Sequence, residues 1–141
     1  MKDIADLIGR ILISFIFLFE AYDSLKYFQQ TKQTMTDYGI TWQQDLMLTV
    51  TIFSLFLGGT LILIGYRASF GAFLVLLYWI PVTFIVHSFW NDPPEIHREE
   101  SIHFMKNMAI LGGVFMVWVN GSGRYSIKRL FATARVPRKD R

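Results

Sequence analysis

Residues 46–90 read LMLTVTIFSLFLGGTLILIGYRASFGAFLVLLYWIPVTFIVHSFW, and Arg67 is the one Asp, Glu, Lys or Arg residue among them. An α-helix of about 20 apolar residues crosses the ~30 Å hydrocarbon core of a bilayer. The segments 46–66 and 68–90 are each long enough to do so. Because only Tyr66 and Arg67 join them, we expect the two helices to form a tight antiparallel pair inside a membrane.

Two more apolar segments, at 6–28 and 104–121, bring the predicted number of membrane spans to four. The 141-residue chain is 52% hydrophobic, and its apolar residues come in long blocks rather than in the stripes typical of soluble helices. The predicted fold is therefore all-α, an integral membrane four-helix bundle formed by residues 1–127. Residues 128–141 are predicted to be a basic tail on the cytoplasmic side.

Basic residues are unevenly shared between the two sides of the predicted membrane. The C-terminal segment from Gly121, which includes the tail, contains Arg124, Lys128, Arg129, Arg135, Arg138, Lys139 and Arg141. The opposite loops, 29–45 and 91–103, are rich in Asp and Glu. By the positive-inside rule, both termini of this multi-pass protein should lie in the cytoplasm of a bacterial inner membrane. The net charge of +3 comes from the tail, so we expect it to contact the lipid bilayer and not nucleic acid.

Small residues occur at helical spacing in three of the predicted spans. They are Gly58-Gly59, Gly71 with Ala68 and Ala72, and Gly112-Gly113 with Ala109. Such residues let membrane helices approach closely. We expect them to pack the helices of one chain against each other, with a dimer contact as the alternative.

Charged and polar side chains at the outer ends of the predicted spans form the main candidate site. They are Glu20, Asp23 and Lys26 in the first span, His87 in the third, and Lys106 and Asn107 in the fourth. Ionisable groups at membrane depth are costly and usually pair with each other or line a polar cavity. We therefore expect Lys106 to reach Glu20 or Asp23, with His87 in the same pocket. Three interpretations remain: an ion-pair network that fixes helix packing, a ligand or quinone head-group pocket, and a proton path or catalytic site.

Arg10 and Arg124 are the candidate polar residues on the cytoplasmic side. Arg10 lies two turns into the first span and has Asp6 one turn before it, so we expect it to pair with Asp6 or with a backbone carbonyl. A contact between Arg10 and the turn at 121–126 is the alternative. In the acidic loop, His97, Glu100 and His103 have spacings that a divalent metal could use. A solvated acidic helix explains them as well, and no metal site is predicted.

Several of these residues together carry a family resemblance. They are Arg10, Lys26, Gly58-Gly59, His87-Ser-Phe89, Lys106-Asn107, Gly112-Gly113 and Gly121-Ser-Gly-Arg-Tyr-Ser126. Their order resembles the DoxX family of small four-span membrane proteins over about residues 4–127, which implies a four-helix membrane bundle. Two features depart from the family pattern. The Glu often found before the Gly-Gly pair is absent, and Ser126-Ile-Lys128 replaces Ser-Leu-Asp. Glu20 or Asp23 would have to supply the missing acid.

The resemblance implies several classes of function. Relatives include a small subunit of a thiosulfate–quinone oxidoreductase and a membrane partner in a thiol-stress complex. This chain has no cysteine and shows no nucleophile constellation or redox-cofactor motif, so we do not expect it to be an enzyme on its own. The predicted function is a small non-catalytic accessory subunit of a larger membrane assembly, or a homo-oligomer, with no cofactor. The alternative is a quinone-binding membrane subunit of an oxidoreductase, with His87, Lys106 or Asn107 as donors to the quinone carbonyls.

Overall fold

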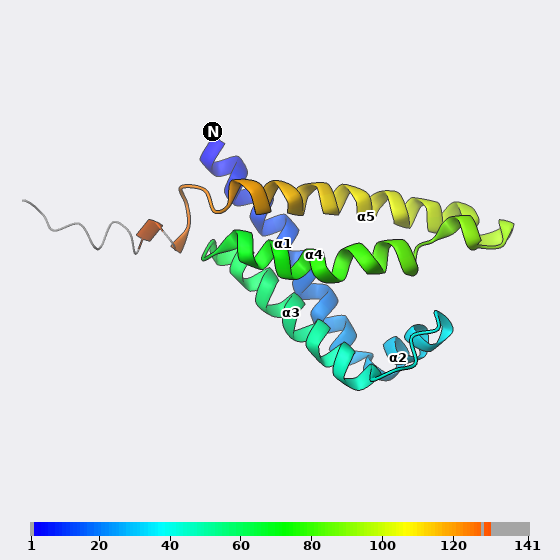
Figure 1. The fold of residues 1–141 in the computed structure, drawn as a ribbon. Helices are drawn as coiled ribbons and strands as arrows, with labels where there is room; N and C mark the ends of the chain where they lie inside the picture. Colours follow the sequence, from blue (N-terminus) through cyan, green and yellow to red (C-terminus); the bar gives the residue numbers. More distant parts are fainter. Residues whose placement is uncertain (1, 128, 131–141) are drawn as a thin grey trace, which may run out of the picture.

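A computed structural model describes residues 2–127 and 129–130, so the predicted basic tail at 128–141 lies almost wholly outside the described residues. All regular structure in the described part is helical (Figure 1). The elements are α1 (Lys2–Lys26), α2 (Phe28–Asp37), α3 (Gln44–Ile64), α4 (Ala68–Ile85), the short 3₁₀ helix η1 (Phe89–Asn91) and α5 (Pro94–Asn120). The prediction of an all-α membrane fold is confirmed.

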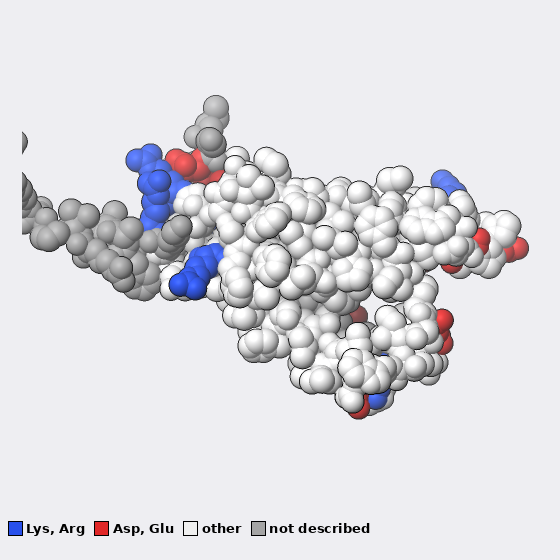
Figure 2. All heavy atoms as spheres, viewed as in Figure 1, with Lys and Arg blue, Asp and Glu red and all other residues white. Residues whose placement is uncertain are grey.

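Three helical segments are long and apolar enough to cross a membrane: α3, the segment 68–91 that contains α4, and α5. Helix α1 is as long as these helices, but it carries Arg10, Glu20 and Asp23. Its place as a fourth span therefore stays a prediction. On the face shown in Figure 2, charged atoms gather at the two ends of the molecule, and a wide middle zone is almost free of them. Such a zone fits the hydrocarbon core of a bilayer.

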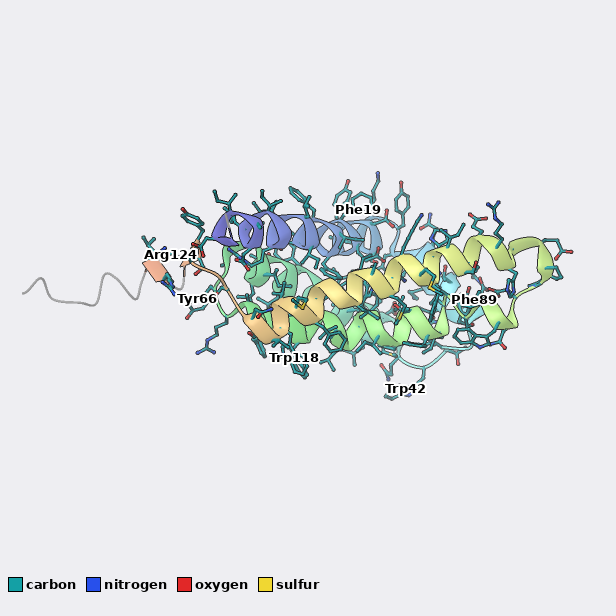
Figure 3. The ribbon with its side chains drawn as sticks, turned by 90° about the horizontal axis from the view of Figure 1, so that it is seen from above. Phe19, Trp42, Tyr66, Phe89, Trp118 and Arg124 are labelled. Carbon is teal, nitrogen blue, oxygen red and sulfur yellow. The ribbon has the colours of Figure 1, made fainter. Side chains whose placement is uncertain are left out.

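The long helices pack in chain order, α1 on α3, α3 on α4 and α4 on α5, with a smaller contact between α1 and α5. The buried core includes Phe17, Leu55, Val75 and Trp79. The ring of Phe17 meets that of Trp79 edge to face, with 5.1 Å between their centroids. Most large apolar side chains instead point outward, as Phe19, Trp42 and Trp118 do in Figure 3. This is the arrangement expected of a protein that lipid surrounds.

Close backbone contact joins α3 to α4. A Cβ atom built on Gly58 would lie 2.8 Å from the carbonyl oxygen of Gly71, and one built on Gly71 would lie 2.7 Å from that of Gly58. These two glycines therefore pack within the chain, as predicted. Gly112 is different, because a Cβ atom there would meet nothing within 4 Å. The small-residue face of α5 that contains Gly112 is thus left uncovered by the described residues.

The turn between α3 and α4 is as short as the sequence predicts. Gly65 adopts a φ of 70° and Arg67 a φ of 50°, so both residues are in the left-handed region that closes helices sharply. The turn brings the end of α3 beside the start of α4. In Figure 1 the two helices then diverge, and α2 lies at the far end of α3.

One predicted loop is wrong. The polar loop expected at 29–45 contains α2, whose Thr31, Thr34 and Thr36 hydroxyls each donate to the carbonyl four residues earlier. Helix α2 has no buried residue, so its sequence has no apolar stripe from which a helix could be predicted. The acidic helix expected at 95–101 runs into the fourth span as predicted, because α5 contains both without a break. Pro94, at the start of α5, is well tolerated in a first helical turn.

Candidate functional site

A cavity of about 770 Å³ lies between the C-terminal end of α1, helix α2, the first half of α3 and the second half of α4. Figure 2 shows the molecule hollowed between the part that holds α2 and the part that holds α4 and α5. The cavity exists because α3 and α4 separate after their close contact at the glycines, and α2 closes one side without filling the space. Its walls are mainly apolar, with Leu74, Leu77 and Val82 among the lining residues.

Acidic and hydroxyl groups from α1 line one part of this cavity. Glu20, Asp23 and Ser24 are all lining residues, and they lie within one turn and a half of the helix. The Ser24 side chain is almost wholly buried, with a residue exposure of 2%. Within the described residues, none of these three side chains has a hydrogen-bond or ion-pair partner. The prediction that Glu20 and Asp23 share a pocket with His87 agrees with this geometry.

His87 reaches the cavity from the turn that follows α4. Its Nδ1 lies 2.8 Å from Oε2 of Glu100 on α5. Its ring stacks on that of His103, with 5.5 Å between centroids. One ring nitrogen of His87 is therefore already engaged by a carboxylate, and the ring is held in place from the α5 side.

Lys106 and Asn107 do not join this group. Lys106 is exposed and borders a separate open groove with Phe89 and Met105, while Asn107 is buried on α5 and does not line the cavity. Lys106 forms no ion pair with Glu20 or Asp23, so the predicted salt bridge is wrong. The reason is geometric: α1 packs chiefly on α3, and its contact with α5 is small.

Lys26, the remaining basic residue of the predicted cluster, also leaves the carboxylates uncompensated. Its ammonium lies over the rings of Tyr27 and Tyr22, at 5.1 and 6.0 Å from their centroids. Cation–π contacts at such distances are weakly favourable at exposed sites. Lys26 is therefore held by aromatic rings at the surface.

Sequence reasoning missed the residues that α2 and the middle of α4 contribute to the cavity. Thr34 and Tyr38 come from the α2 side, and Tyr78 comes from α4. Burial raises the pKa of the Tyr38 phenol, and the negative charges of Glu100, Asp92 and Asp37 raise it further. Tyr78 could have been suspected from its sequence, since a tyrosine in the middle of an apolar span needs somewhere to place its hydroxyl.

Residues of the acidic loop do not gather as metal ligands would. Within the described residues, no group of three His, Asp or Glu side chains is placed to hold a metal ion. His103 instead lies 3.9 Å from Glu99 on its own helix, and His97 packs edge to face on Phe89.

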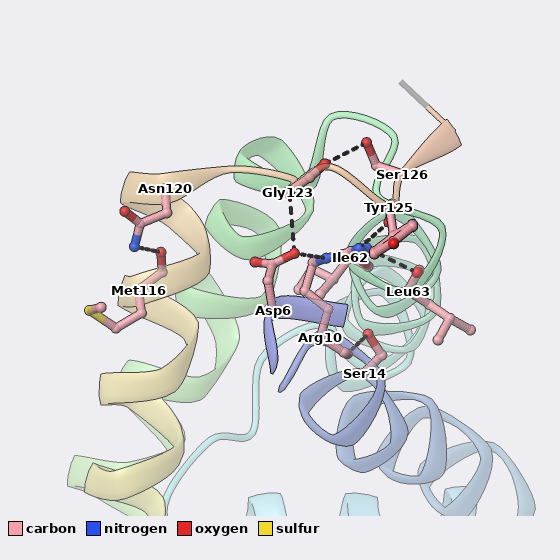
Figure 4. A network of polar contacts seen from close by, with 10 residues as sticks. All are labelled: Asp6, Arg10, Ser14, Ile62, Leu63, Met116, Asn120, Gly123, Tyr125 and Ser126. Carbon is pink, nitrogen blue, oxygen red and sulfur yellow. Dashed lines mark hydrogen bonds and ion pairs between the residues drawn. The ribbon is translucent and has the colours of Figure 1, made fainter. Parts of the chain in front are cut away.

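Arg10 is the centre of a second polar site at the opposite end of the molecule (Figure 4). Its residue exposure is 1%. The guanidinium donates to Asp6 Oδ2 at 3.0 Å, to the carbonyls of Ile62 and Leu63 at 3.1 and 3.3 Å, and to the carbonyl of Tyr125. Both predicted partners are present, because Arg10 pairs with Asp6 and also binds the turn after α5.

The same site is packed closely around glycine. The Gly123 amide donates to Asp6 Oδ2 at 3.2 Å, and a Cβ atom on Gly123 would collide with this carboxylate. A Cβ atom on Gly65 would lie 2.7 Å from Nη1 of Arg10 and 2.6 Å from Cβ of Ser126. The segment Gly121–Ser126 therefore closes over Arg10 and ties the end of α5 to α1 and α3.

Arg124 takes no part in this network. Its side chain is 71% exposed, and its Nη1 lies 3.8 Å from Oδ2 of Asp3. An exposed pair at such a distance contributes little to stability.

Comparisons with known proteins give this architecture a family. The DoxX family model matches residues 5–88. The chain belongs to the DoxX family. It is 29% identical to the inner membrane protein YqjF of Escherichia coli over 92% of this chain and 94% of YqjF. It is 25% identical to the inner membrane protein YphA of the same organism, over 87% of each chain.

A similarity over a shorter part of the chain links it to a surfeit locus protein 4 homolog of Schizosaccharomyces pombe, with 26% identity over 63% of this chain and 29% of that protein. No solved structure matches. The DoxX match ends at residue 88, so it contains every residue that lines the cavity, from Glu20 to His87. Helix α5, with Lys106, and the segment after it, with Arg124, lie beyond the matched residues.

Proposed function

We propose that this chain is a non-catalytic accessory subunit of a larger assembly in a bacterial inner membrane, and that it holds a largely apolar ligand in its cavity. The cavity carries the proposal. Its volume of about 770 Å³ falls within the roughly 300–1,000 Å³ of typical small-molecule sites. Apolar walls with a few polar groups at one side are the usual composition of such sites.

The arrangement of the lining suits an amphipathic molecule. An apolar body would contact Leu74, Leu77 and Val82 on α4, and a polar group would reach Glu20 and Asp23 on α1. Tyr78 lies on the same helix as the apolar wall and offers a hydroxyl to that group. The apolar wall on α4 and the carboxylates on α1 therefore line the same cavity.

The accessory role is supported by the uncovered face of α5. Ala109 is exposed and Gly112 has open space beside it, so another membrane helix could approach α5 closely there. Mild extraction of the tagged chain from its native membrane, followed by mass spectrometry, should recover it with other membrane proteins. Recovery of the chain alone under several mild detergents would contradict the accessory role.

Ligand binding is tested by filling the cavity. Native mass spectrometry of the gently extracted protein should detect a bound small molecule. Leu77→Trp should reduce the bound fraction, because the indole would occupy cavity volume. Leu12→Trp is the matched control, since Leu12 is 66% exposed on α1 and does not line the cavity. Equal ligand retention in the two variants would contradict a binding role for the cavity.

A quinone-binding subunit of an oxidoreductase is the second candidate. The cavity is large enough for a quinone ring and part of its tail, and Tyr78 and His87 are donors beside it. Decylubiquinone should then bind the purified chain, and Tyr78→Phe should weaken this binding. We expect no quinol oxidation by the chain alone, and a turnover that Tyr78→Phe abolishes would instead make it an enzyme.

We also propose that both termini lie in the cytoplasm and that the cavity opens at the periplasmic end. Figure 2 supports this orientation, because basic atoms gather at the end near the N-terminus and acidic atoms dominate the other end. A fluorescent protein fused to residue 141 should fluoresce. An alkaline phosphatase fusion at the same position that is active would reverse the orientation.

A further inference from the structure

We propose that the cavity ligand is a cationic amphiphile, an apolar body that carries a protonated amine or another organic cation. This inference rests on the proposed binding function and specifies the ligand's chemistry. It starts from the charges that line the cavity. Glu20 and Asp23 contribute carboxylates, and none of the lining residues is Lys or Arg. The walls opposite are apolar, so the site combines a negative region with space for a hydrophobic body.

No Lys or Arg of the described chain pairs with these carboxylates, and His87, the basic group nearest Glu20, is itself paired with Glu100. Neither Glu20 nor Asp23 has an ion-pair partner there, and the nearby ammonium of Lys26 faces the rings of Tyr22 and Tyr27. Charges removed from bulk water without a partner are costly, and most in a membrane. A bound cation would provide the missing counter-charge. It would also attract both carboxylates at once by charge, whereas a neutral ligand could offer them hydrogen bonds without a counter-charge.

Ser24 supplies an independent observation at the same place. Its hydroxyl belongs to a residue that is only 2% exposed, it lines the cavity, and it has no hydrogen-bond partner in the part of the chain that is described. The Ser24 oxygen is not one of the described buried atoms that lack a partner, so it stays open to the cavity and can accept a hydrogen bond from a ligand. An ammonium N–H could donate to its oxygen while binding Glu20 and Asp23 on the same helix face.

A quinone fits this polar region less well. Quinone carbonyls only accept hydrogen bonds. Ionised carboxylates also only accept them, so Glu20 and Asp23 could not hydrogen-bond to a quinone. His87 is the basic group of the lining, and its Nδ1 is already engaged by Glu100 at 2.8 Å. Of the three residues expected to donate to a quinone, His87 lines the cavity, while Lys106 and Asn107 lie outside it.

The surroundings of Tyr38 point the same way. Tyr38 lines the cavity on its α2 side, and its hydroxyl senses the negative charges of Glu100, Asp92 and Asp37. These acids come from two separate segments, the end of α2 and the turn and helix after α4. Lys32 on α2 is already paired with Asp45, and an excess of negative charge raises the local concentration of cations. Cations would therefore be enriched where they enter.

The test compares two probes of nearly the same size and opposite charge. Equilibrium dialysis of the full chain in dodecyl maltoside should show saturable binding of tetraphenylphosphonium and binding of tetraphenylborate at least roughly tenfold weaker. Equal uptake of both ions, or preference for the borate, would overturn the inference. Decylubiquinone that binds while tetraphenylphosphonium does not would also overturn it and leave the binding function intact. Failure of all three probes would contradict the inference and the binding function together.

Variants locate the binding. Glu20→Gln and Asp23→Asn keep the shape of each side chain and remove its charge, so each should weaken tetraphenylphosphonium binding about tenfold to a hundredfold. Glu95→Gln is the control, because Glu95 is an exposed carboxylate in the first turn of α5 and does not line the cavity. Equal affinities in all three variants would place the probe elsewhere and overturn the inference. Thermal unfolding of each variant in the same detergent shows that the fold is retained.

Competition distinguishes two sources of the same chemistry. Decylamine is a free amphiphilic amine, and lyso-phosphatidylethanolamine carries its amine in a lipid headgroup. Displacement of tetraphenylphosphonium by either supports the inference, and the stronger competitor identifies the source. If neither competes while decanol does, the site selects for an apolar chain alone and the inference is overturned.

Discussion

The two ends of this molecule use the same helices in opposite ways. Near the basic end, α1 and α3 enclose Arg10, whose guanidinium meets one carboxylate and three carbonyls. At the acidic end, α1 and α3 line a cavity of about 770 Å³ in which Glu20 and Asp23 have no partner. The basic end, called the closed end below, encloses a charge with hydrogen-bond partners. The acidic end, called the open end, has a cavity beside carboxylates without such partners.

This difference indicates where stability and function lie. Buried polar groups that are all paired give a rigid and specific structure. Unpaired polar groups away from water reduce stability, and a bound ion or ligand is one explanation for their presence. Local unfolding energies differ within one protein, and binding elements are drawn from the less stable regions. We therefore expect the end around Arg10 to determine the free energy of global unfolding. We expect the end around Glu20 and Asp23 to change its local stability chiefly when a ligand binds.

The largest effect should come from Arg10→Met. The change removes the guanidinium but leaves Asp6 and the carbonyls of Ile62, Leu63 and Tyr125 without their donor. Breaking a buried charged network in this way typically costs about 3–5 kcal/mol. Denaturant unfolding in detergent micelles measures the loss. Arg124→Met is the control, and it should change the free energy of unfolding by less than about 1 kcal/mol because that pair is exposed. Similar losses for both variants would remove the distinction between the two sites.

A smaller loss is expected from Gly58→Ala, which acts where α3 and α4 are closest. The new methyl group would lie 2.8 Å from the Gly71 carbonyl oxygen, so the two helices must move apart. Overpacking of this kind costs roughly 1–3 kcal/mol. Gly112→Ala is the matched control, since open space surrounds that position, and it should be neutral or slightly stabilising. If both variants unfold alike, the glycine contact does not hold the helices together.

Gln44→Ala should have a local effect at the open end. The Gln44 amide donates to the Ile40 carbonyl at 2.6 Å, to Thr36 Oγ1 at 2.8 Å and to the Lys32 carbonyl at 3.3 Å, and it thereby fastens α2 to the start of α3. Loss of these bonds should cost about 1 kcal/mol and raise amide hydrogen exchange in α2 several-fold, with α4 unchanged.

The control for this variant is Gln33→Ala, whose amide contacts Asp37 within α2 itself. It removes a side-chain hydrogen bond of the same kind without loosening α2 from α3. A uniform increase in exchange over all helices after Gln44→Ala would show that α2 belongs to the global folding unit and not to a separate, weaker one.

The sequence predicts the long helices and the closed end better than it predicts the open end. Long apolar segments set the positions of α3 and α4, and a carboxylate four residues before Arg10 indicates their pairing. Helix α2 could not be recognised, because its polar surface carries no apolar stripe and its stability depends on contacts such as Gln44. The Lys106 prediction failed for a related reason: spans that end on the same side of a membrane need not be neighbours in the bundle.

The smallest effect should come from Lys106→Met, and it tests the same comparison at the acidic end. Lys106 is exposed and has no carboxylate partner among Glu20 and Asp23, so its removal breaks no ion pair with them. Its ammonium borders apolar side chains such as Met105, which a methionine can contact equally well. The free energy of unfolding should therefore change by less than about 0.5 kcal/mol, and tetraphenylphosphonium binding should not weaken. A loss as large as that of Gly58→Ala would mean that Lys106 neutralises the carboxylates after all, and the cavity would then no longer need a cation from its ligand.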